Sequence, residues 1–545
     1  MTTPLRVSID QLEVDITPHL DGRRVSVDHH LHDAIACHLG IARDQVHDYT
    51  IDRRSLDARH KPRLNFIYRL EARVSDGSPV REGKGVTVHT QAPDQDQSLY
   101  HLKLRDELPR EPVVVGTGPA GIMAAYLLAL HGCRPLVLDR GRDVSRRGAD
   151  VEQFHRSREL NPNSNFLFGE GGAGTYSDGK LYTRVKDRRM RFLLEAFAAA
   201  RAPREILYVH HPHIGSDILP HMARRMRAQI EAWGGRFRWE AEVSDIIERD
   251  GRCAGVVLSD GEQISADCTL IAPGHSARAL IRRLLERNLD HKAKGFQLGC
   301  RIEHDQRLIN TARYGCVAPP KHLLTAAEYN LVSRPPKHLD AEGVTTFCMC
   351  PGGEIICATS DTERLSTNGM SRHHRGSPYA NAGLICNQSV DRDNALAGFD
   401  LIEQLERAAF TAGGGDYSCP AQSAFAFLRG EDSAVQESSY RLGVRPGRID
   451  QILPKRTVKS LREALKYFER RIPGFLKNGN LVGVETRVSS PVRFERDPDT
   501  LASSLPGLYL GGEGAGYAGG IVSAGLDGLR LAETILTGIA ARRER

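Results

Sequence analysis

The sequence predicts a three-part α/β fold, and three observations lead to this prediction. Residues 112–141 follow the order strand, glycine turn, helix, strand, which is how a parallel nucleotide-binding sheet begins. Residues 505–528, near the other end of the chain, again combine a short apolar strand, a glycine-rich turn and the start of a helix. Residues 1–75 alternate between strand-like and helix-like patterns, which is typical of a small α+β unit.

In the N-terminal unit, the patterns predict three strands and one helix. Residues 7–14, 46–51 and 64–74 read as strands, and residues 27–39 have apolar residues at helical spacing. A region rich in Gly, Ser, Asp and Gln follows, with one more expected strand at residues 86–89.

The segment at residues 112–141 predicts a dinucleotide site. Val113–Val115 suits a buried parallel strand, and three glycines with G-x-G-x-x-G spacing follow it. The first glycine permits the tight turn, the second lets a pyrophosphate approach the backbone, and the third lets helix and strand pack closely. Free N–H groups at the helix start hold the anion. The cofactor contacts expected here are Gly116, Gly118, Pro119, Ala120 and Gly121.

The second strand of this unit, residues 135–138, ends at an acidic residue. Asp139 lies about 20 residues beyond the glycines, where a carboxylate accepts ribose hydroxyls in dinucleotide-binding folds. Asp139 and the adjacent Arg140 are therefore expected cofactor contacts.

Two later segments favour FAD over NAD at this site. In two-dinucleotide and hydroxylase-type flavoenzymes, a strand and glycine turn like residues 505–528 lie beside the flavin, with an acid on the ribityl chain and a helix N-terminus at the N1–C2=O edge. Residues 268–274 resemble the Ala-Thr-Gly element of the same flavoproteins, although Pro273 stands where Thr is usual. The expected flavin contacts are Ala272, Gly274, Gly512, Glu513, Gly520 and Ile521.

The glycine-rich segment 165–180 is a further expected cofactor contact. Five glycines in eleven residues leave the backbone close to a partner, and short hydroxyl side chains lie among them. The alternative is a solvated loop, against which Phe166 and Tyr176 argue. The expected contacts are Gly171, Gly172, Gly174, Thr175 and Ser177. Lys180 could balance an anionic reduced flavin or a substrate carboxylate, or it could be a surface charge.

The order of these segments predicts the domain organisation. Residues 1–105 form a small N-terminal α+β domain and linker, and residues 106–290 form the first part of a Rossmann-type FAD-binding domain. Residues 291–479 form an inserted α+β substrate or cap domain, and residues 480–545 complete the FAD-binding domain. The length of 545 residues and the 40% hydrophobic content are sufficient for several cores.

Composition is typical of a cytoplasmic protein. No apolar run approaches a membrane span, and the N-terminus lacks the apolar core of a signal peptide. The eleven cysteines have no framework spacing, which suits a reducing compartment. A formal charge of +6 neither requires nor excludes nucleic acid. The basic run at residues 53–61 is best interpreted as a solvated face, with an acidic partner or nucleic acid as the alternative.

Cys348 and Cys350 are the most suggestive chemical pair. The C-x-C spacing on a strand puts both thiols on one face, where they could relay electrons or attack a substrate as a thiolate. They could equally be buried structural cysteines. No second pair completes a zinc site, and the tract His210-His-Pro-His lacks the thiols or regular helical spacing of a metal site, so no metal is expected.

The polar residues in and after the turn at residues 272–276 have two possible interpretations. His275, Ser276 and Arg278 could reach the flavin or a substrate. Ser276 could instead cap the helix expected at residues 277–286.

Several motifs together resemble a family of bacterial FAD-dependent dehydrogenases (NAD(P)/FAD-dependent oxidoreductases). They lie at residues 53–59, 116–121, 165–180, 346–353, 367–370, 485–491 and 511–520, so the resemblance covers nearly the whole chain. It implies a cytosolic, FAD-containing oxidoreductase and does not specify a substrate.

The function expected is transfer of a hydride or electron pair through flavin N5, to or from a small-molecule substrate under the inserted domain. Because no second G-x-G-x-x-G unit is visible, NAD(P)H would bind transiently, or the substrate or a protein such as ferredoxin would reduce the flavin. The alternatives are a flavin-dependent enzyme acting on RNA or protein, and a non-catalytic FAD-containing binding module. The sequence makes no prediction about the oligomeric state.

Overall fold

The architecture described here is that of a computed structural model. It describes residues 4–19, 27–61, 63–80, 82–89, 99–183, 185–335, 338–391 and 394–538. Part of the expected linker, residues 90–98, lies outside these ranges.

A five-stranded parallel sheet forms the centre of the nucleotide-binding part, in the order β22-β11-β5-β6-β7. Its strands are β5 (Val113–Val115), β6 (Leu136–Leu138), β7 (Arg236–Arg238), β11 (Thr269–Ile271) and β22 (Leu508–Leu510). The predicted Rossmann-type sheet is therefore confirmed. Because β22 pairs in parallel with β11, the C-terminal segment returns to the sheet that the first segment began.

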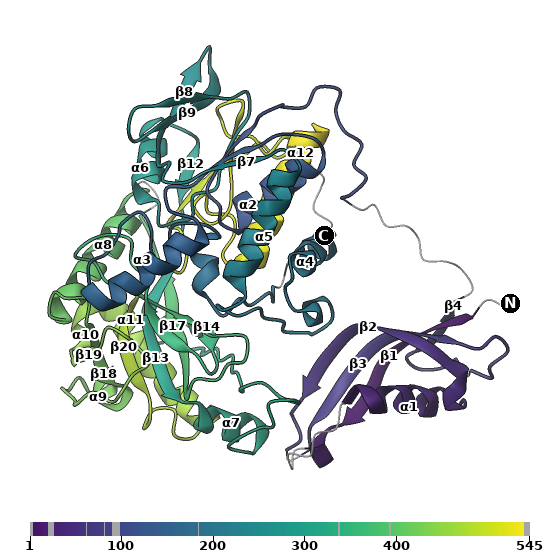
Figure 1. The fold of residues 1–545 in the computed structure, drawn as a ribbon. Coiled ribbons are helices and arrows are strands. Elements are labelled where there is room, and N and C mark those ends of the chain that lie inside the picture. Colours follow the sequence, from purple (N-terminus) through teal and green to yellow (C-terminus); the bar gives the residue numbers. More distant parts are fainter. Residues whose placement is uncertain are drawn as a thin grey trace.

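Three helices pack together on one face of this sheet, α2 (Pro119–Leu130), α5 (Leu219–Ala232) and α12 (Ile521–Thr537) (Figure 1). The backbones of α2 and α12 are in close contact, since a Cβ added to Gly528 would lie 2.0 Å from the Ala120 carbonyl oxygen. The helices α3 (Val144–Ser157) and α4 (Met190–Ala199) and the short turns η3 (Gly172–Tyr176) and η4 (Arg204–Leu207) complete this part.

A three-stranded antiparallel sheet lies between β7 and β11 in the sequence. Its strands are β8 (Val243–Arg249), β9 (Arg252–Leu258) and β10 (Gln263–Ser265), and α6 (Arg278–Glu286) packs on β8.

The inserted part is a six-stranded sheet with helices against it, in the order β14-β17-β13-β20-β18-β19. Its strands are β13 (Phe296–Asp305), β14 (Val344–Cys350), β17 (Tyr379–Gln388), β18 (Cys419–Ser423), β19 (Val444–Pro446) and β20 (Asn480–Glu485). The helices of this part are α7 (Gln306–Tyr314), α8 (Ala397–Ala412), α9 (Ala424–Arg429), α10 (Ile449–Ile452) and α11 (Lys455–Arg471). Two short antiparallel pairs accompany it, β15 (Glu354–Cys357) with β16 (Thr367–Met370) and β12 (His291–Ala293) with β21 (Val492–Phe494).

The expected boundary at residue 479 needs a correction. Strand β20, assigned from the sequence to the returning FAD-binding part, pairs with β13 and β18 of the inserted sheet. Its six residues are all buried, as a central strand of that sheet requires. The chain therefore leaves the inserted sheet after Glu485.

The N-terminal domain is an antiparallel sheet in the order β2-β3-β1-β4. Its elements are β1 (Leu5–Asp15), η1 (Thr17–His19), α1 (Val27–Leu39), η2 (Arg43–Gln45), β2 (Val46–Asp57), β3 (Asn65–Val74) and β4 (Val86–His89). Figure 1 shows α1 against one face of this sheet, and Leu31 and Ile35 of α1 are fully buried there.

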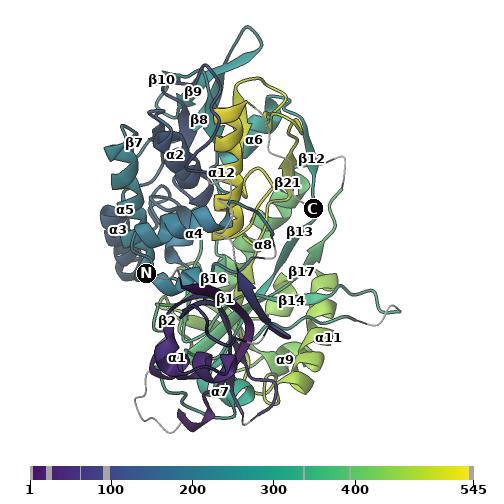
Figure 2. The same ribbon diagram turned by 90° about the vertical axis from the view of Figure 1, so that its right-hand side faces the viewer.

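The N-terminal domain docks on the rest of the protein through β2 and the loop after β2. The Arg54 N–H donates to the Tyr208 carbonyl at 2.8 Å, and the His210 N–H donates to the Arg54 carbonyl at 2.9 Å. Lys61 donates to the carbonyl of Ala312 on α7, and Figures 1 and 2 both show α7 beside this domain. The basic run at residues 53–61 is therefore partly an interdomain contact and not simply a solvated face.

Candidate functional site

The glycine turn between β5 and α2 is built as its spacing predicts. A Cβ on Gly116 would lie 2.4 Å from the Ala272 carbonyl oxygen, and a Cβ on Gly121 would lie 1.9 Å from the Gly116 carbonyl oxygen. Gly116 also has a φ of +97°. By contrast, a Cβ on Gly118 would meet no protein atom within 4 Å, and its φ of −64° suits any residue. The space beside Gly118 is thus where a ligand can approach the backbone.

The segment 165–180 lies directly against this turn. A Cβ on Gly172 would lie 2.9 Å from the Gly118 Cα atom. A Cβ on Gly174 would lie 3.3 Å from the Ile521 side chain and 3.5 Å from Pro119. Three segments that are far apart in the sequence therefore meet around the start of α2, as expected for residues that share one cofactor.

The hydroxyl groups in this segment hydrogen-bond within it. Thr175 donates to the Glu170 carbonyl at 3.0 Å, and Ser177 donates to the Gly174 carbonyl at 2.8 Å. Their hydroxyl protons therefore already have acceptors within the segment, contrary to the expectation that both hydroxyl groups donate to a cofactor. The segment offers a cofactor mainly its backbone, in line with its glycine content.

The carboxylate of Asp139 accepts hydrogen bonds from the glycine turn. It accepts hydrogen bonds from the N–H and hydroxyl of Thr117, at 2.9 and 2.5 Å, and from the N–H of Gly141 at 2.9 Å. Its contact with a ribose stays a prediction. Arg140 pairs with Glu242 at 3.2 Å and donates to Asn163 at 2.6 Å.

The C-terminal glycine turn lies beside the other two flavin segments. A Cβ on Gly512 would lie 3.0 Å from the Ala120 Cβ, and one on Gly514 would lie 2.7 Å from the Gly274 carbonyl oxygen. Glu513 places Oε1 3.3 Å from Nδ1 of His275. His275 is buried, and its Nε2 has no hydrogen-bond partner among the described residues.

These features fit a flavin dinucleotide. Gly118, Gly274 and Gly520 have open space where a Cβ would be, and the unpartnered His275 Nε2 is a buried polar atom beside the Gly274 turn. A buried polar atom of this kind costs free energy unless it has a partner. The residues that would hold FAD are thus those of the glycine turn, the segment 171–177 and the turns at 272–275 and 512–521.

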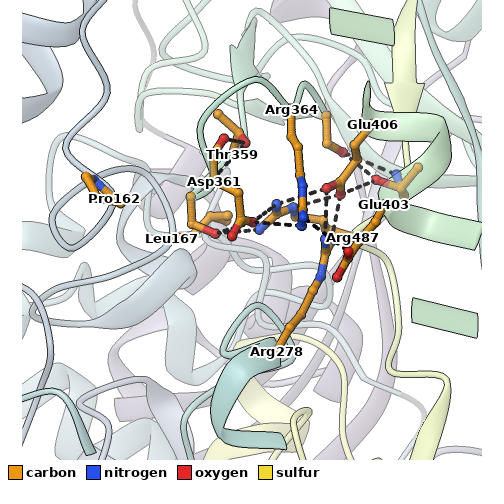
Figure 3. Close-up of polar contacts among 12 residues, drawn as sticks. Pro162, Leu167, Arg278, Thr359, Asp361, Arg364, Glu403, Glu406 and Arg487 are labelled. Atoms are coloured by element: carbon orange, nitrogen blue, oxygen red, sulfur yellow. Dashed lines mark hydrogen bonds and ion pairs between the residues drawn. The ribbon is translucent and has the colours of Figure 1, made fainter. Parts of the chain in front are cut away.

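Arg278 belongs to a buried ion network and not to the expected flavin contacts (Figure 3). Helix α6 begins with Ala277 as its N-cap and no side-chain cap, so the interpretation of Ser276 as a cap is wrong. The Arg278 guanidinium donates to Glu406 of α8 at 2.7 and 2.9 Å.

The same carboxylate connects the inserted domain to this network. Arg487 contacts Glu406 at 3.0 Å and Asp361 at 2.9 Å. Burial alone would raise the pKa of Glu406, but Arg487 and Arg278 lower that pKa to about 2. The network joins α6 of the FAD-binding part to the inserted domain.

A second polar cluster surrounds Lys180, at the end of the segment 165–180. Lys180 Nζ lies 3.4 Å from Glu328, and the Arg375 guanidinium pairs with Asp178 at 2.8 Å. Burial opposes the charged form, but Glu328 and Asp178 raise the pKa of Lys180. Lys180 is a partly buried cation with carboxylate partners, and its role beside the flavin or a substrate stays a prediction.

The thiols of Cys348 and Cys350 lie beside this cluster. The side-chain hydrogen bond from Cys350, together with the charges of Arg301 and Lys180, lowers the pKa of Cys348 to about 6 against the opposing effect of burial. Arg301 is fully buried, and it donates to the Cys348 carbonyl at 2.7 Å and to Glu485 at 3.0 Å. Lys180, Cys348 and Cys350, the three catalytic candidates, are thus brought together.

The charged residues that surround these candidates were not predicted from the sequence. They are Asp178, Arg301, Glu328, Arg375 and Glu485. Asp178 and Glu485 lie inside motifs that were noted, whereas nothing local distinguishes Arg301 or Glu328.

The histidine tract lies close to the same cluster. His211 contacts Glu328 at 3.1 Å, and the buried His213 contacts the His373 carbonyl at 2.9 Å. Burial lowers the pKa of His213 to about 4. Across the residues that the structure describes, no group of three or more His, Cys, Asp or Glu side chains is placed to hold a metal ion.

The fold and this site define an FAD-dependent protein, and comparison with known proteins supports this class. Residues 295–488 match the family model described as FAD-dependent protein, C-terminal domain-like, and residues 114–169 match the NAD(P)-binding Rossmann-like domain. Residues 8–73 match a domain of unknown function. An uncharacterized protein of Clostridium beijerinckii is 37% identical over 513 residues, which cover 91% of this chain and 94% of that protein. The chain therefore belongs to this family of FAD-dependent proteins, and its cofactor is FAD.

Solved structures show weaker likeness. A geranylgeranyl bacteriochlorophyll reductase-like protein of Thermoplasma acidophilum is 13% identical, with a TM-score of 0.33, and covers 78% of this chain and 77% of its own. The L-proline dehydrogenase of P. horikoshii is 12% identical, with a TM-score of 0.33, and covers 79% of this chain and 94% of its own. None of the helices in the described part of the chain is long and apolar enough to cross a membrane.

Proposed function

We propose that this protein is an FAD-dependent oxidoreductase that passes a hydride or electron pair between FAD and a small-molecule substrate held beside Lys180. The observation that carries this proposal is the path of the segment 165–180. Gly172 lies against Gly118 of the phosphate-binding turn, and eight residues later Lys180 lies in the charged cluster against the inserted sheet. One segment thus links the phosphate site to a buried group of titratable side chains, the usual composition of an active site.

FAD supplies a ring nitrogen, N5, that exchanges a hydride with a substrate. The protein residues have three tasks around it. The glycine turn and the segment 171–177 bind and orient the dinucleotide, the Asp178–Arg375 pair fixes the end of that segment, and Lys180 provides a positive charge for an anionic substrate or reduced cofactor. NAD(P)H is the transient electron donor that we consider first, because the sequence shows no second dinucleotide site.

Anaerobic photoreduction of the holoprotein, followed by rapid mixing with pools of metabolites, tests this function. A metabolite that reoxidises the flavin identifies an oxidising substrate, and one that reduces the oxidised flavin identifies a donor. The variant Lys180→Gln should keep its FAD but transfer electrons at least tenfold more slowly, whereas Lys186→Gln, at an exposed lysine, should match the wild type.

Two results would contradict the proposal. A flavin that responds to no metabolite or nicotinamide under anaerobic conditions would indicate a non-catalytic FAD module. RNA that copurifies with the holoprotein and is needed for flavin reoxidation would indicate an enzyme acting on RNA.

A further inference from the structure

We propose that Cys348 and Cys350 form a reversible dithiol–disulfide pair, in which Cys348 reacts with a disulfide substrate and Cys350 is the resolving thiol. This inference rests on the proposed function, because reduced FAD supplies the electrons, and it names the substrate class. The pairing of the two thiols can nevertheless be measured without the flavin.

The backbone of β14 is distorted at these two residues. The register with β17 shifts between Phe347 and Cys350, and Cys348 has a φ of +42°, an uncommon value for a residue other than glycine. Such a bulge re-aims a side chain away from the regular alternation of a strand. The Cys350 thiol donates to the Cys348 carbonyl at 3.2 Å, and the two thiols also share a side-chain hydrogen bond.

The bulge is held by buried charged and amide groups. Arg301 donates to the Cys348 carbonyl at 2.7 Å and to the Asn381 side chain at 2.9 Å, and its guanidinium lies 3.0 Å from the Glu485 carboxyl group. A fully buried arginine is expensive to maintain unless it is paired and hydrogen-bonded, as this one is. Buried polar interactions therefore hold the backbone of Cys348 in this conformation.

The two thiols differ in access and environment. Cys348 is partly exposed and Cys350 is buried, the asymmetry that a reacting thiol and a resolving thiol require. Cys350, Arg301 and Lys180 together favour the Cys348 thiolate. Burial instead raises the pKa of Cys268 and of Cys357 to about 12, so these cysteines suit a structural role.

The redox steps balance on these two sulfur atoms. The Cys348–Cys350 disulfide accepts two electrons and one proton from reduced FAD, and the S–S bond breaks to give the Cys348 thiolate and the Cys350 thiol. The Cys348 thiolate attacks a substrate disulfide, which forms a mixed disulfide and releases one substrate thiolate. Cys350 loses its proton and attacks the Cys348 sulfur, which restores the internal disulfide and releases the second substrate thiolate.

Differential alkylation of the wild-type protein tests the pair without any variant. After equilibration with glutathione redox buffers, the protein is denatured in iodoacetamide and digested with trypsin. Peptide 338–364 contains Cys348, Cys350 and the internal control Cys357. Under oxidising conditions we expect this peptide to carry one alkyl group, on Cys357, and to be two hydrogen atoms lighter. Three alkyl groups at every redox poise would overturn the proposal.

The rate at which the native protein is alkylated, measured against pH, tests whether Cys348 ionises to a thiolate more readily than an ordinary thiol. We expect the half-maximal rate of Cys348 modification near pH 6, whereas a small-molecule thiol such as N-acetylcysteine, alkylated in the same buffers, should have its midpoint at about 8.5. Lys180→Gln should move the Cys348 midpoint to higher pH. A Cys348 midpoint equal to that of the small-molecule thiol would contradict the assignment of the reacting thiol.

Electron counting separates this proposal from the proposed function. Anaerobic dithionite titration of the oxidised holoprotein should consume about four electrons per FAD in the wild type and in the control Cys316→Ser, but about two in Cys348→Ser/Cys350→Ser, because a disulfide is a two-electron couple. Glutathione disulfide should reoxidise the photoreduced wild type at least tenfold faster than the double variant. Uptake of two electrons by all three proteins would overturn the thiol pair while an oxidoreductase function stands, whereas failure to bind FAD would overturn the function itself.

Discussion

The Nδ1 atom of His275 lies 3.3 Å from the Oε1 atom of Glu513. This contact joins the turn after β11 to the turn after β22, two segments that are more than 200 residues apart in the sequence. The opposite ring nitrogen, His275 Nε2, has no partner among the described residues. Glu513 thus orients an imidazole whose free nitrogen is available to a ligand beside the Gly274 turn.

Glu513→Ala should weaken FAD binding by about 1.5–3 kcal/mol, the usual loss for a hydrogen bond to a charged group. This corresponds to roughly a ten- to hundredfold increase in Kd, which fluorescence titration of the deflavinated protein would measure. Glu513→Gln keeps a side chain of the same length and should lose less. Equal affinity in all three proteins would show that neither Glu513 nor the His275 orientation contributes to binding.

The purified protein should be yellow and release FAD, not FMN, on acid treatment. The reason is that the glycine turn leaves open space beside Gly118 for a pyrophosphate, as in folds that bind a dinucleotide with an adenosine half, which FMN lacks. Chromatography of the released flavin distinguishes the two. FMN as the sole flavin would mean that the turn after β5 has another role.

Gly118→Val should abolish FAD binding and leave the fold intact. The new side chain meets no protein atom within 4 Å at the Cβ position and needs no unusual backbone angle, so a loss of flavin reports directly on the ligand space. Absorbance at 450 nm relative to 280 nm measures occupancy, and circular dichroism checks the fold.

Gly376→Val is a matched control, because a Cβ there also meets open space. It should retain its flavin. In contrast, Gly121→Ala places a Cβ 1.9 Å from a backbone oxygen and should disrupt folding. Full occupancy in a soluble Gly118→Val protein would refute the placement of the pyrophosphate.

Glu406→Gln should destabilise the protein by about 3–5 kcal/mol, because it leaves Arg278 buried without its carboxylate partner and leaves Arg487 with Asp361 alone. Thermal unfolding measures this loss. The matched control Glu403→Gln, at a partly exposed carboxylate, should lose less. A small effect at both positions would mean that the network does not couple the domains energetically.

The free energy of unfolding should depend on pH through the ionisation of the Glu406 carboxylate. The folded pKa of Glu406 is about 2, below its ordinary value of about 4.5. The stabilisation is therefore fully present above the unfolded pKa and is lost as the pH falls toward 2. The wild type should become less stable relative to Glu406→Gln when the pH is lowered from 5 to 3, and parallel curves would contradict this.

The sequence predicted the parts of the fold that short-range patterns define. Glycine spacing and apolar runs located β5, α2, β6, β11, β22 and α12, because each of these elements has a local signature. Strand β20 was placed in the wrong domain, since its apolar run suits a central strand of either sheet. Pairing partners are decided by tertiary structure, which a run of six residues does not encode.

The same distinction applies to the site. Lys180 and the two thiols were found because each belongs to an unusual local motif. Their partners Arg301, Glu328 and Arg375 come from three separate segments, and charged residues on strands and loops are ordinarily exposed. Only the tertiary fold brings them together.

The position of β22 and α12 in the chain has a consequence for biosynthesis. The ribosome makes β5, β6, β7 and β11 first, then the whole inserted domain, and only afterwards residues 508–537. Until then, β11 lacks its outer neighbour and the apolar surface of α2 lacks the helix that covers it. The nucleotide-binding sheet therefore stays incomplete while more than 200 residues are translated. We therefore expect FAD to bind late in folding, after β22 has paired with β11 and α12 has packed on α2.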